Sequence, residues 1–205
     1  QNTERVASGN IEGNGNLVLK LYYNRNTYTV TLETNGGTIN SGNINSYTYG
    51  IESTLPTDIT KQGHHFRGWY KSQEQEGETI EKIEEGQTGN KTYYAKWETN
   101  KYTVTFKNGD KTEKTQEIEH GGNAEAPALT KAGYTLTWDK NFTNITQDIT
   151  VNAIWTANTN TKYTVEHYKQ NKEQNGYELA ETDNLEGTTD QEATAEAKTY
   201  KGFSE

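Results

Sequence analysis

The tripeptide Tyr-Thr-Val occurs three times in the chain, beginning at Tyr28, Tyr102 and Tyr163. Each copy stands in a segment where apolar and polar residues alternate, and this two-residue period is that of a β-strand with one buried face. The first two copies lead to an Asn-Gly pair, at Asn35-Gly36 and Asn108-Gly109, which favours the positive-φ positions of a tight turn. A local pattern that returns along the chain predicts a tandem array of small β modules.

The first two copies also share a second half. In each, a proline is followed by a glycine, an apolar residue and a tryptophan, and the second copy is one residue shorter at the position of Gly68. Each copy then ends in a further alternating strand that closes on Trp97 or Trp155. We therefore expect a complete module over residues 27–99 and a shorter one over residues 100–157.

The two flanks have the pattern of two pieces of a further module. Residues 1–26 contain a closing strand, with three leucines and Tyr23 on one face, but no opening strand. Residues 158–205 contain an opening strand without a closing one. Because an unpaired sheet edge can accept a strand from another chain, we expect neighbouring copies to be partners, with residues 1–26 of one completing residues 162–205 of the next. Such a contact is heterologous and repeats head to tail.

The composition supports ordered β modules with thin cores. Hydrophobic residues make up only 29% of the chain, but 14 Tyr and 4 Trp are present and the formal net charge is a modest −9, so aromatic side chains can fill small cores. We expect a mainly β fold with little helix, at most a short helix near residues 50–54 or 80–85. Because the linkers are short and polar, we expect the modules to form an elongated rod.

Composition also excludes several classes of protein. The chain has no cysteine, which excludes disulfides and thiolate metal sites. No apolar run approaches the ~20 residues that cross a bilayer, so we expect no membrane insertion within this segment. The acidic balance, with no basic stripe, predicts no nucleic-acid partner.

The first module contains the segments YTVTLETNGGT, PTDITKQGHHFRGWY and KTYYAKW. These segments resemble the internalin-type B-repeat, also known as the Listeria-Bacteroides repeat. Residues 100–157, from KYTVTFKNGD through ITVNAIW, resemble a shorter variant of it. In the flanks, SGNIEGNGNLVLKLYY resembles the end of a mucin-binding-protein-type (MucBP-type) module, and YTVEHYKQNKEQNGYEL with TAEAKTYKGF resembles the start of one. By this resemblance residues 1–26 are the C-terminal part of one MucBP-like module and residues 158–205 the N-terminal part of another.

These families imply β-grasp-like domains on bacterial surface proteins, often repeated as stalks, with host or glycan adhesion in some members. We therefore expect an extracellular, non-enzymatic stalk or spacer segment of an adhesin-like protein at the bacterial cell surface or cell wall. The alternative is an adhesion module that binds host glycoprotein or polysaccharide through exposed aromatic side chains. The candidate contacts are Tyr22, Tyr47, Tyr49 and Tyr70.

No catalytic, cofactor-binding or metal-ligating constellation stands out, and we expect no enzyme and no cofactor. The four tryptophans recur at module positions and are assigned to cores rather than to glycan stacking. Adjacent His64 and His65 would face opposite sides of a strand and could not chelate one ion together, and the other two histidines are isolated. The acidic residues 181–192 lack the spacing of a calcium loop, so we expect a solvated loop there.

Overall fold

The computed structural model describes residues 4–204. The chain divides into a first unit that ends at Asn100 and a second unit that begins at Lys101. The described residues form fourteen strands and no helix, which confirms the mainly β fold. In place of the short helices considered near residues 50–54 and 80–85, β4 (Ser53–Thr54) and β7 (Lys82–Ile83) pair with each other, because each segment is too short to nucleate a helix.

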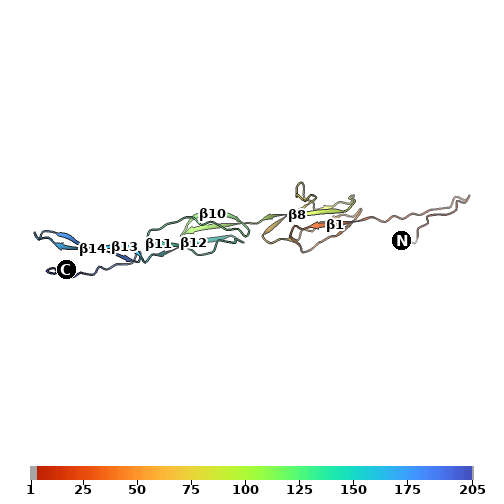
Figure 1. The fold of residues 1–205 in the computed structure, drawn as a ribbon. Coiled ribbons are helices and arrows are strands. Elements are labelled where there is room, and N and C mark those ends of the chain that lie inside the picture. Colours follow the sequence, from red (N-terminus) through yellow and green to blue (C-terminus); the bar gives the residue numbers. More distant parts are fainter. Residues whose placement is uncertain (1–3, 205) are drawn as a thin grey trace. The chain divides into compact units, whose positions relative to one another are not determined.

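A four-stranded mixed sheet forms the centre of the first unit (Figure 1). Its strands are β1 (Thr27–Glu33), β3 (Ser46–Thr48), β6 (His64–Tyr70) and β8 (Lys91–Thr99). They follow the order β3-β1-β8-β6. The two central strands, β1 and β8, run parallel to each other, and each has an antiparallel neighbour at the edge of the sheet.

The core of the first unit is built by the inward residues of this sheet together with its loops. Besides β4 and β7, the loops carry a second short ladder, β2 (Thr38–Ile39) with β5 (Ile59–Thr60). The alternating pattern of the long strands decides which of their side chains point inward. The buried cluster consists of Val30, Tyr47, Leu55, Ile59, Trp69, Ile83, Tyr93 and Ala95.

The second unit has the same strand order as the first, but among its described residues it lacks the short strand pairs in the loops and has fewer core residues. Its sheet consists of β9 (Lys101–Asn108), β10 (Lys111–Glu119), β11 (Tyr134–Trp138) and β12 (Ile149–Ala157). The order is β10-β9-β12-β11, and the central pair β9 and β12 is again parallel. The core is correspondingly small and consists of Val104, Phe106, Ala124, Ile145 and Val151.

A glycine explains why the second copy is one residue shorter. In the first unit the pairing of β6 with β8 shifts register between Phe66 and Gly68, which marks a β-bulge. Gly68 has φ +126°, and a Cβ there would lie 2.7 Å from Thr79 Cγ2. In the second unit β11 pairs with β12 without a shift, so no residue corresponds to Gly68.

The flanks differ from the two complete sheets. β13 (Thr161–Gln170) and β14 (Tyr177–Gly187) form a two-stranded antiparallel sheet, called here the C-terminal hairpin. Residues 4–26 form no strand; they contain an isolated bridge between Val6 and Lys20 and a turn closed by the hydrogen bond from Gly15 N to Glu12 O. Within the described residues, neither flank contributes a side chain to the buried core, and β13 pairs only with β14.

Candidate functional site

Two of the four tyrosines that were candidates for ligand contact lie in the interior. Tyr47 exposes 3% of its surface and Tyr70 exposes 9%, so the expectation that they are exposed is wrong. The ring of Tyr47 packs 5.4 Å from that of Tyr28, its hydroxyl donates a hydrogen bond to Gly89 O at 2.7 Å, and burial raises its pKa. Lys96 Nζ covers the Tyr70 ring at 5.1 Å from the centroid.

The other two candidates are exposed but come from separate segments. Tyr22 lies in the strand-free residues 4–26, where its hydroxyl donates to Glu4 Oε2 at 3.4 Å. Tyr49 follows β3, and its carbonyl oxygen accepts a hydrogen bond from Arg25 Nη1 at 3.0 Å. Their contact with a ligand stays a prediction.

Three of the four tryptophans pack in the two cores, as their recurrence predicts, whereas Trp155 is partly buried and belongs to neither core cluster. Trp69 is buried and donates from Nε1 to Pro56 O at 2.7 Å. Trp97, half-buried, donates to Thr34 O at 2.8 Å, and Trp138 packs edge-on against Phe106 with 5.1 Å between ring centroids. The indole N–H groups of the first two are therefore satisfied by backbone within their own unit. Trp155 donates from Nε1 to Asn108 Oδ1 at 3.0 Å.

The histidines do not combine into a metal site. No group of three or more His, Cys, Asp or Glu side chains within residues 4–204 is placed to hold an ion. His64 Nδ1 lies 2.7 Å from Gln62 O, and His120 Nδ1 lies 3.4 Å from the Tyr102 hydroxyl. Among the described residues, only His167 has a carboxylate partner, Asp183, with 3.2 Å between His167 Nε2 and Asp183 Oδ2.

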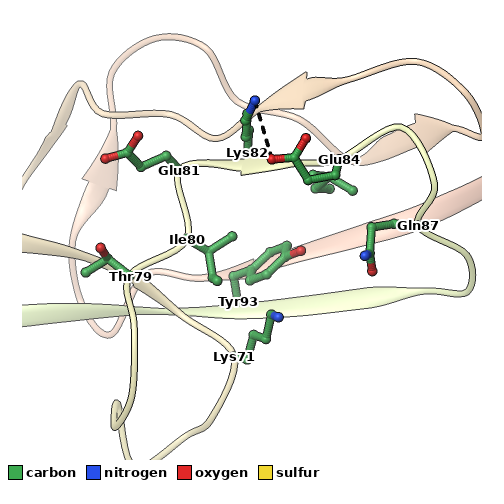
Figure 2. A pocket seen from close by; sticks show the side chains of 9 residues that line it. Lys71, Thr79, Ile80, Glu81, Lys82, Glu84, Gln87 and Tyr93 are labelled. Carbon is green, nitrogen blue, oxygen red and sulfur yellow. Dashed lines mark ion pairs between the residues drawn. The ribbon is translucent and has the colours of Figure 1, made fainter.

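A cleft of about 290 Å³ opens on the first unit beside β7. Figure 2 shows Tyr93 and Ile80 between Lys71 and the ion pair of Lys82 with Glu84. Lys82 Nζ lies 3.4 Å from Glu84 Oε1 and 2.6 Å from Glu52 Oε2, and these hydrogen bonds, led by that to Glu52, raise its pKa. The cleft is thus lined by a cation that is paired with carboxylates and by the side chain of Tyr93, without a nucleophile aimed at a base.

A group of charged side chains lies on the C-terminal hairpin. Lys198 Nζ, from the segment that follows β14, lies 2.9 Å from Glu181 Oε1 and 2.5 Å from Asp183 Oδ1. Tyr200 donates its hydroxyl hydrogen to Glu181 Oε2 at 3.0 Å. Together with His167 these side chains form the hairpin cluster. The solvated loop expected over residues 181–192 is therefore wrong for its first part, because β14 runs to Gly187 and its carboxylates find cationic partners.

The electrostatics of the hairpin cluster favour fixed charges. The hydrogen bond from Lys198 is the main reason that the pKa values of Asp183 and Glu181 are lowered. The same contacts, with Asp183 first, raise the pKa of Lys198. All three groups stay charged at neutral pH, so they can hold the segment after β14 against the hairpin. The arrangement supplies no poised acid or base.

The hairpin is also fastened to the second sheet at its other end. Gly133 O accepts hydrogen bonds from Asn158 N at 2.8 Å and from Thr189 Oγ1 at 2.7 Å. Thr189 N donates to Asn158 O at 2.9 Å, and the hydroxyls of Thr161 and Thr189 lie 2.5 Å apart. These contacts form a joint that restricts rotation of the hairpin against the sheet.

Comparison with known proteins assigns the family. The family described as the Listeria-Bacteroides repeat domain matches residues 28–96 and 102–167. The chain belongs to this family. The Listeria-Bacteroides repeats of the chain thus coincide with the two mixed sheets, and the second match continues into β13.

Two proteins of Evansella cellulosilytica are similar to the chain. One, named "Putative membrane protein", is 35% identical over 159 residues, which is 68% of this chain and 22% of the relative. The other, named "Putative Gly-rich membrane protein", is 31% identical over 156 residues, 70% of this chain and 18% of the relative. The chain therefore spans about a fifth of the length of these relatives. Within residues 4–204 the structure contains no helix able to cross a membrane.

Proposed function

We propose that this chain is a non-enzymatic spacer segment of an extracellular bacterial surface protein, built to hold other parts of that protein at a distance. The observation that carries this proposal is the parallel pairing of the first and last long strands in each sheet. When these two strands are parallel neighbours, the polypeptide enters the sheet at one end and leaves it at the opposite end. The entry and exit points of each sheet are then separated by the full length of that sheet.

The register of the strands gives the distance between the entry and exit points of each sheet. In the first sheet Val30 pairs with Lys91, so Thr27 and Thr99 lie about eleven residues apart along the strand direction, or roughly 36 Å at ~3.3 Å per residue. In the second sheet Val104 pairs with Ile149, and the ends of β9 and β12 have the same offset. The second unit is shorter in sequence, but its entry and exit points are separated by the same distance.

The parallel pair also suits a segment that transmits tension. Force applied between the two ends of a sheet shears β1 against β8, so that their hydrogen bonds must break together. Force that separates an antiparallel pair from its end opens the bonds one at a time. Shear therefore resists force better than opening from the end, even when the two strand pairs have a similar number of hydrogen bonds.

Single-molecule pulling through introduced cysteines tests the proposal, since the chain has none of its own. Attachment at Thr27→Cys and Thr99→Cys loads β1 and β8 in shear. Attachment at His64→Cys and Thr99→Cys, which are paired across β6 and β8, opens the sheet from its end. We expect a several-fold higher unfolding force in the first geometry. Equal forces in the two geometries would contradict a spacer that resists tension through its parallel strands.

The alternative, adhesion to host glycoprotein or polysaccharide through aromatic side chains, rests on Tyr22 and Tyr49 alone, because Tyr47 and Tyr70 are buried. A glycan array and a mucin pull-down with the whole chain address it. Binding that is lost in a Tyr22→Ser/Tyr49→Ser variant would favour adhesion over the spacer function. Absence of binding favours the spacer.

Two finer assignments belong to the same proposal. The order of the long strands, with parallel central strands flanked by antiparallel edges, supports β-grasp-like modules. The flanks, residues 1–26 and 158–205, are proposed as the C-terminal and N-terminal parts of MucBP-like modules. Localisation at the cell wall or cell surface follows from the use of such repeats in surface proteins.

A further inference from the structure

The cleft beside β7 is built almost entirely by the segment that links β6 to β8. Residues 71–90 form this link, and they supply every residue that lines the cleft except Tyr93. The corresponding link in the second unit, residues 139–148, is half as long. The lining of the cleft thus comes from a part of the first unit that differs in length from its counterpart.

Backbone contacts hold this segment against the rest of the first unit. Ile80 N donates a hydrogen bond to Trp69 O at 2.7 Å, and Glu81 O accepts one from Leu55 N at 2.8 Å. The next residues form β7, which pairs with β4. The walls of the cleft are therefore fixed before a ligand arrives, which lowers the entropic cost of binding.

One side chain that lines the cleft has a hydroxyl without a partner in the protein. Tyr93 exposes only 3% of its surface, and within residues 4–204 its hydroxyl makes no hydrogen bond. No fully enclosed side-chain oxygen or nitrogen of the described residues lacks a partner, so this hydroxyl must be reached from the cleft. Figure 2 shows it directed toward Gln87. Burial raises the pKa of Tyr93, so the hydroxyl stays protonated and can donate.

The second sheet shows that the fold does not need a hydroxyl at this position. Tyr93 pairs with Leu32 in the first sheet, and Val151 pairs with Phe106 at the same register position in the second. Val151 is apolar and fully buried. Because a buried polar group without a partner costs stability, the hydroxyl of Tyr93 is better explained by a ligand than by the fold.

The other polar side chains of the cleft favour a neutral ligand. The side chains of Lys71 and Gln87 make no hydrogen bond or ion pair within residues 4–204. An anion bound here would meet the carboxylates of Glu81 and Glu84, and a cation would meet the ammonium of Lys71. A neutral molecule with several hydroxyls can use both kinds of group, because each hydroxyl donates and accepts hydrogen bonds.

The size of the cleft and its apolar surface fit one sugar ring. Its volume of about 290 Å³ lies at the lower end of the roughly 300–1,000 Å³ that ligand pockets occupy. Ile80 lines the cleft among these polar groups and is only partly buried, so it offers apolar surface to the C–H groups of a ring.

We propose that this cleft binds one neutral sugar ring, with the Tyr93 hydroxyl, the Lys71 ammonium and the Gln87 amide bonding to the ring hydroxyls. This site goes beyond the spacer function, because it gives the first unit a ligand, and neither proposal depends on the other. It also uses none of the exposed tyrosines.

NMR titration of the whole chain with the methyl glycosides of glucose, galactose, mannose and N-acetylglucosamine tests the proposal. We expect at least one of these probes to bind in the millimolar range and to shift backbone amides within residues 71–93. Tyr93→Phe keeps the aromatic ring and should weaken this binding about fivefold. It should not lower stability, because the hydroxyl has no partner in the protein. The control is Tyr94→Phe, in the same strand but outside the cleft, which should leave the affinity unchanged.

Charged probes test the class of ligand. Glucuronate and glucosamine, at a pH where both are ionised, should bind more weakly than the best methyl glycoside. Tighter binding of either one would overturn the assignment to a neutral sugar. The site itself would be refuted if none of the four glycosides shifted the amides of residues 71–93, or if Tyr93→Phe bound as tightly as the parent. A loss of stability in Tyr93→Phe would contradict the argument that the fold does not use this hydroxyl.

Discussion

Trp69 shows how a single side chain can hold a small module together. It is almost fully buried, and its indole N–H is bonded to Pro56 O in the loop between β4 and β5. Trp69→Ala removes this bond and a large part of a thin core, which we expect to cost about 3–5 kcal/mol. Chemical denaturation followed by hydrogen exchange should show the loss in the first unit. His65→Ala, at an exposed position of the same strand, is the control and should change stability by less than about 0.5 kcal/mol.

The hairpin cluster makes the C-terminal hairpin sensitive to acid. The pKa values of Asp183 and Glu181 are lowered, mainly by Lys198. A lowered pKa adds stability above the unfolded value of about 4, and this stability is lost as the pH falls through the folded value. The pKa of Lys198 is raised, so its contribution is present below about 10.4 and is lost as the pH rises through the folded value. The hairpin should therefore be best protected between about pH 5 and 10.

Carboxyl titration by NMR measures this prediction. In Lys198→Met the pKa values of Asp183 and Glu181 should move upward, and the hairpin amides should lose protection against exchange at a higher pH than in the parent. The control is Lys172→Met, in the loop between β13 and β14. This change keeps the hairpin cluster and should leave the pKa values of Asp183 and Glu181 unchanged. Unchanged titration in Lys198→Met would show that the lysine does not set these pKa values.

Among the structural elements, the bulge in β6 has a testable cause. Gly68 takes a positive φ, and an added Cβ would meet Thr79 Cγ2 at 2.7 Å. We expect Gly68→Ala to destabilise the first unit by about 1–3 kcal/mol. Gly77→Ala separates the cost of the positive φ from the cost of the contact with Thr79, because Gly77 also has a positive φ but has open space around its Cβ position. If the two variants lose equal stability, the close approach to Thr79 contributes nothing.

The strands were more predictable from the sequence than the exposure of their side chains. Alternation and the Tyr-Thr-Val repeat place β1, β9 and β13 correctly, because they are local properties of the chain. The burial of Tyr47 depends on its pairing with Tyr28 in β1, which no local pattern encodes. In the same way, Lys198 meets Asp183 only after β14 has folded back. Composition alone therefore suggested a solvated loop where the structure has a strand with paired charges.

For the whole molecule, the two separate cores predict two separate unfolding events. The buried clusters around Trp69 and Phe106 share no residue, and sites without common partners usually contribute to stability independently. The combination of Trp69→Ala with Phe106→Ala should therefore lower the stability of each unit as much as the corresponding single change does. Hydrogen exchange resolved by unit checks this additivity.

Pulling on the whole chain should resolve the two units by length. Each sheet spans roughly 36 Å when folded, but residues 27–99 and 101–157 release different lengths of polypeptide. At ~3.6 Å per extended residue, the first unit should lengthen by roughly 230 Å and the second by roughly 170 Å. Trp69→Ala should lower the force of the longer step and leave the shorter one unchanged. A single extension event would mean that the two sheets unfold together. The unit of unfolding would then be the pair of repeats and not each repeat.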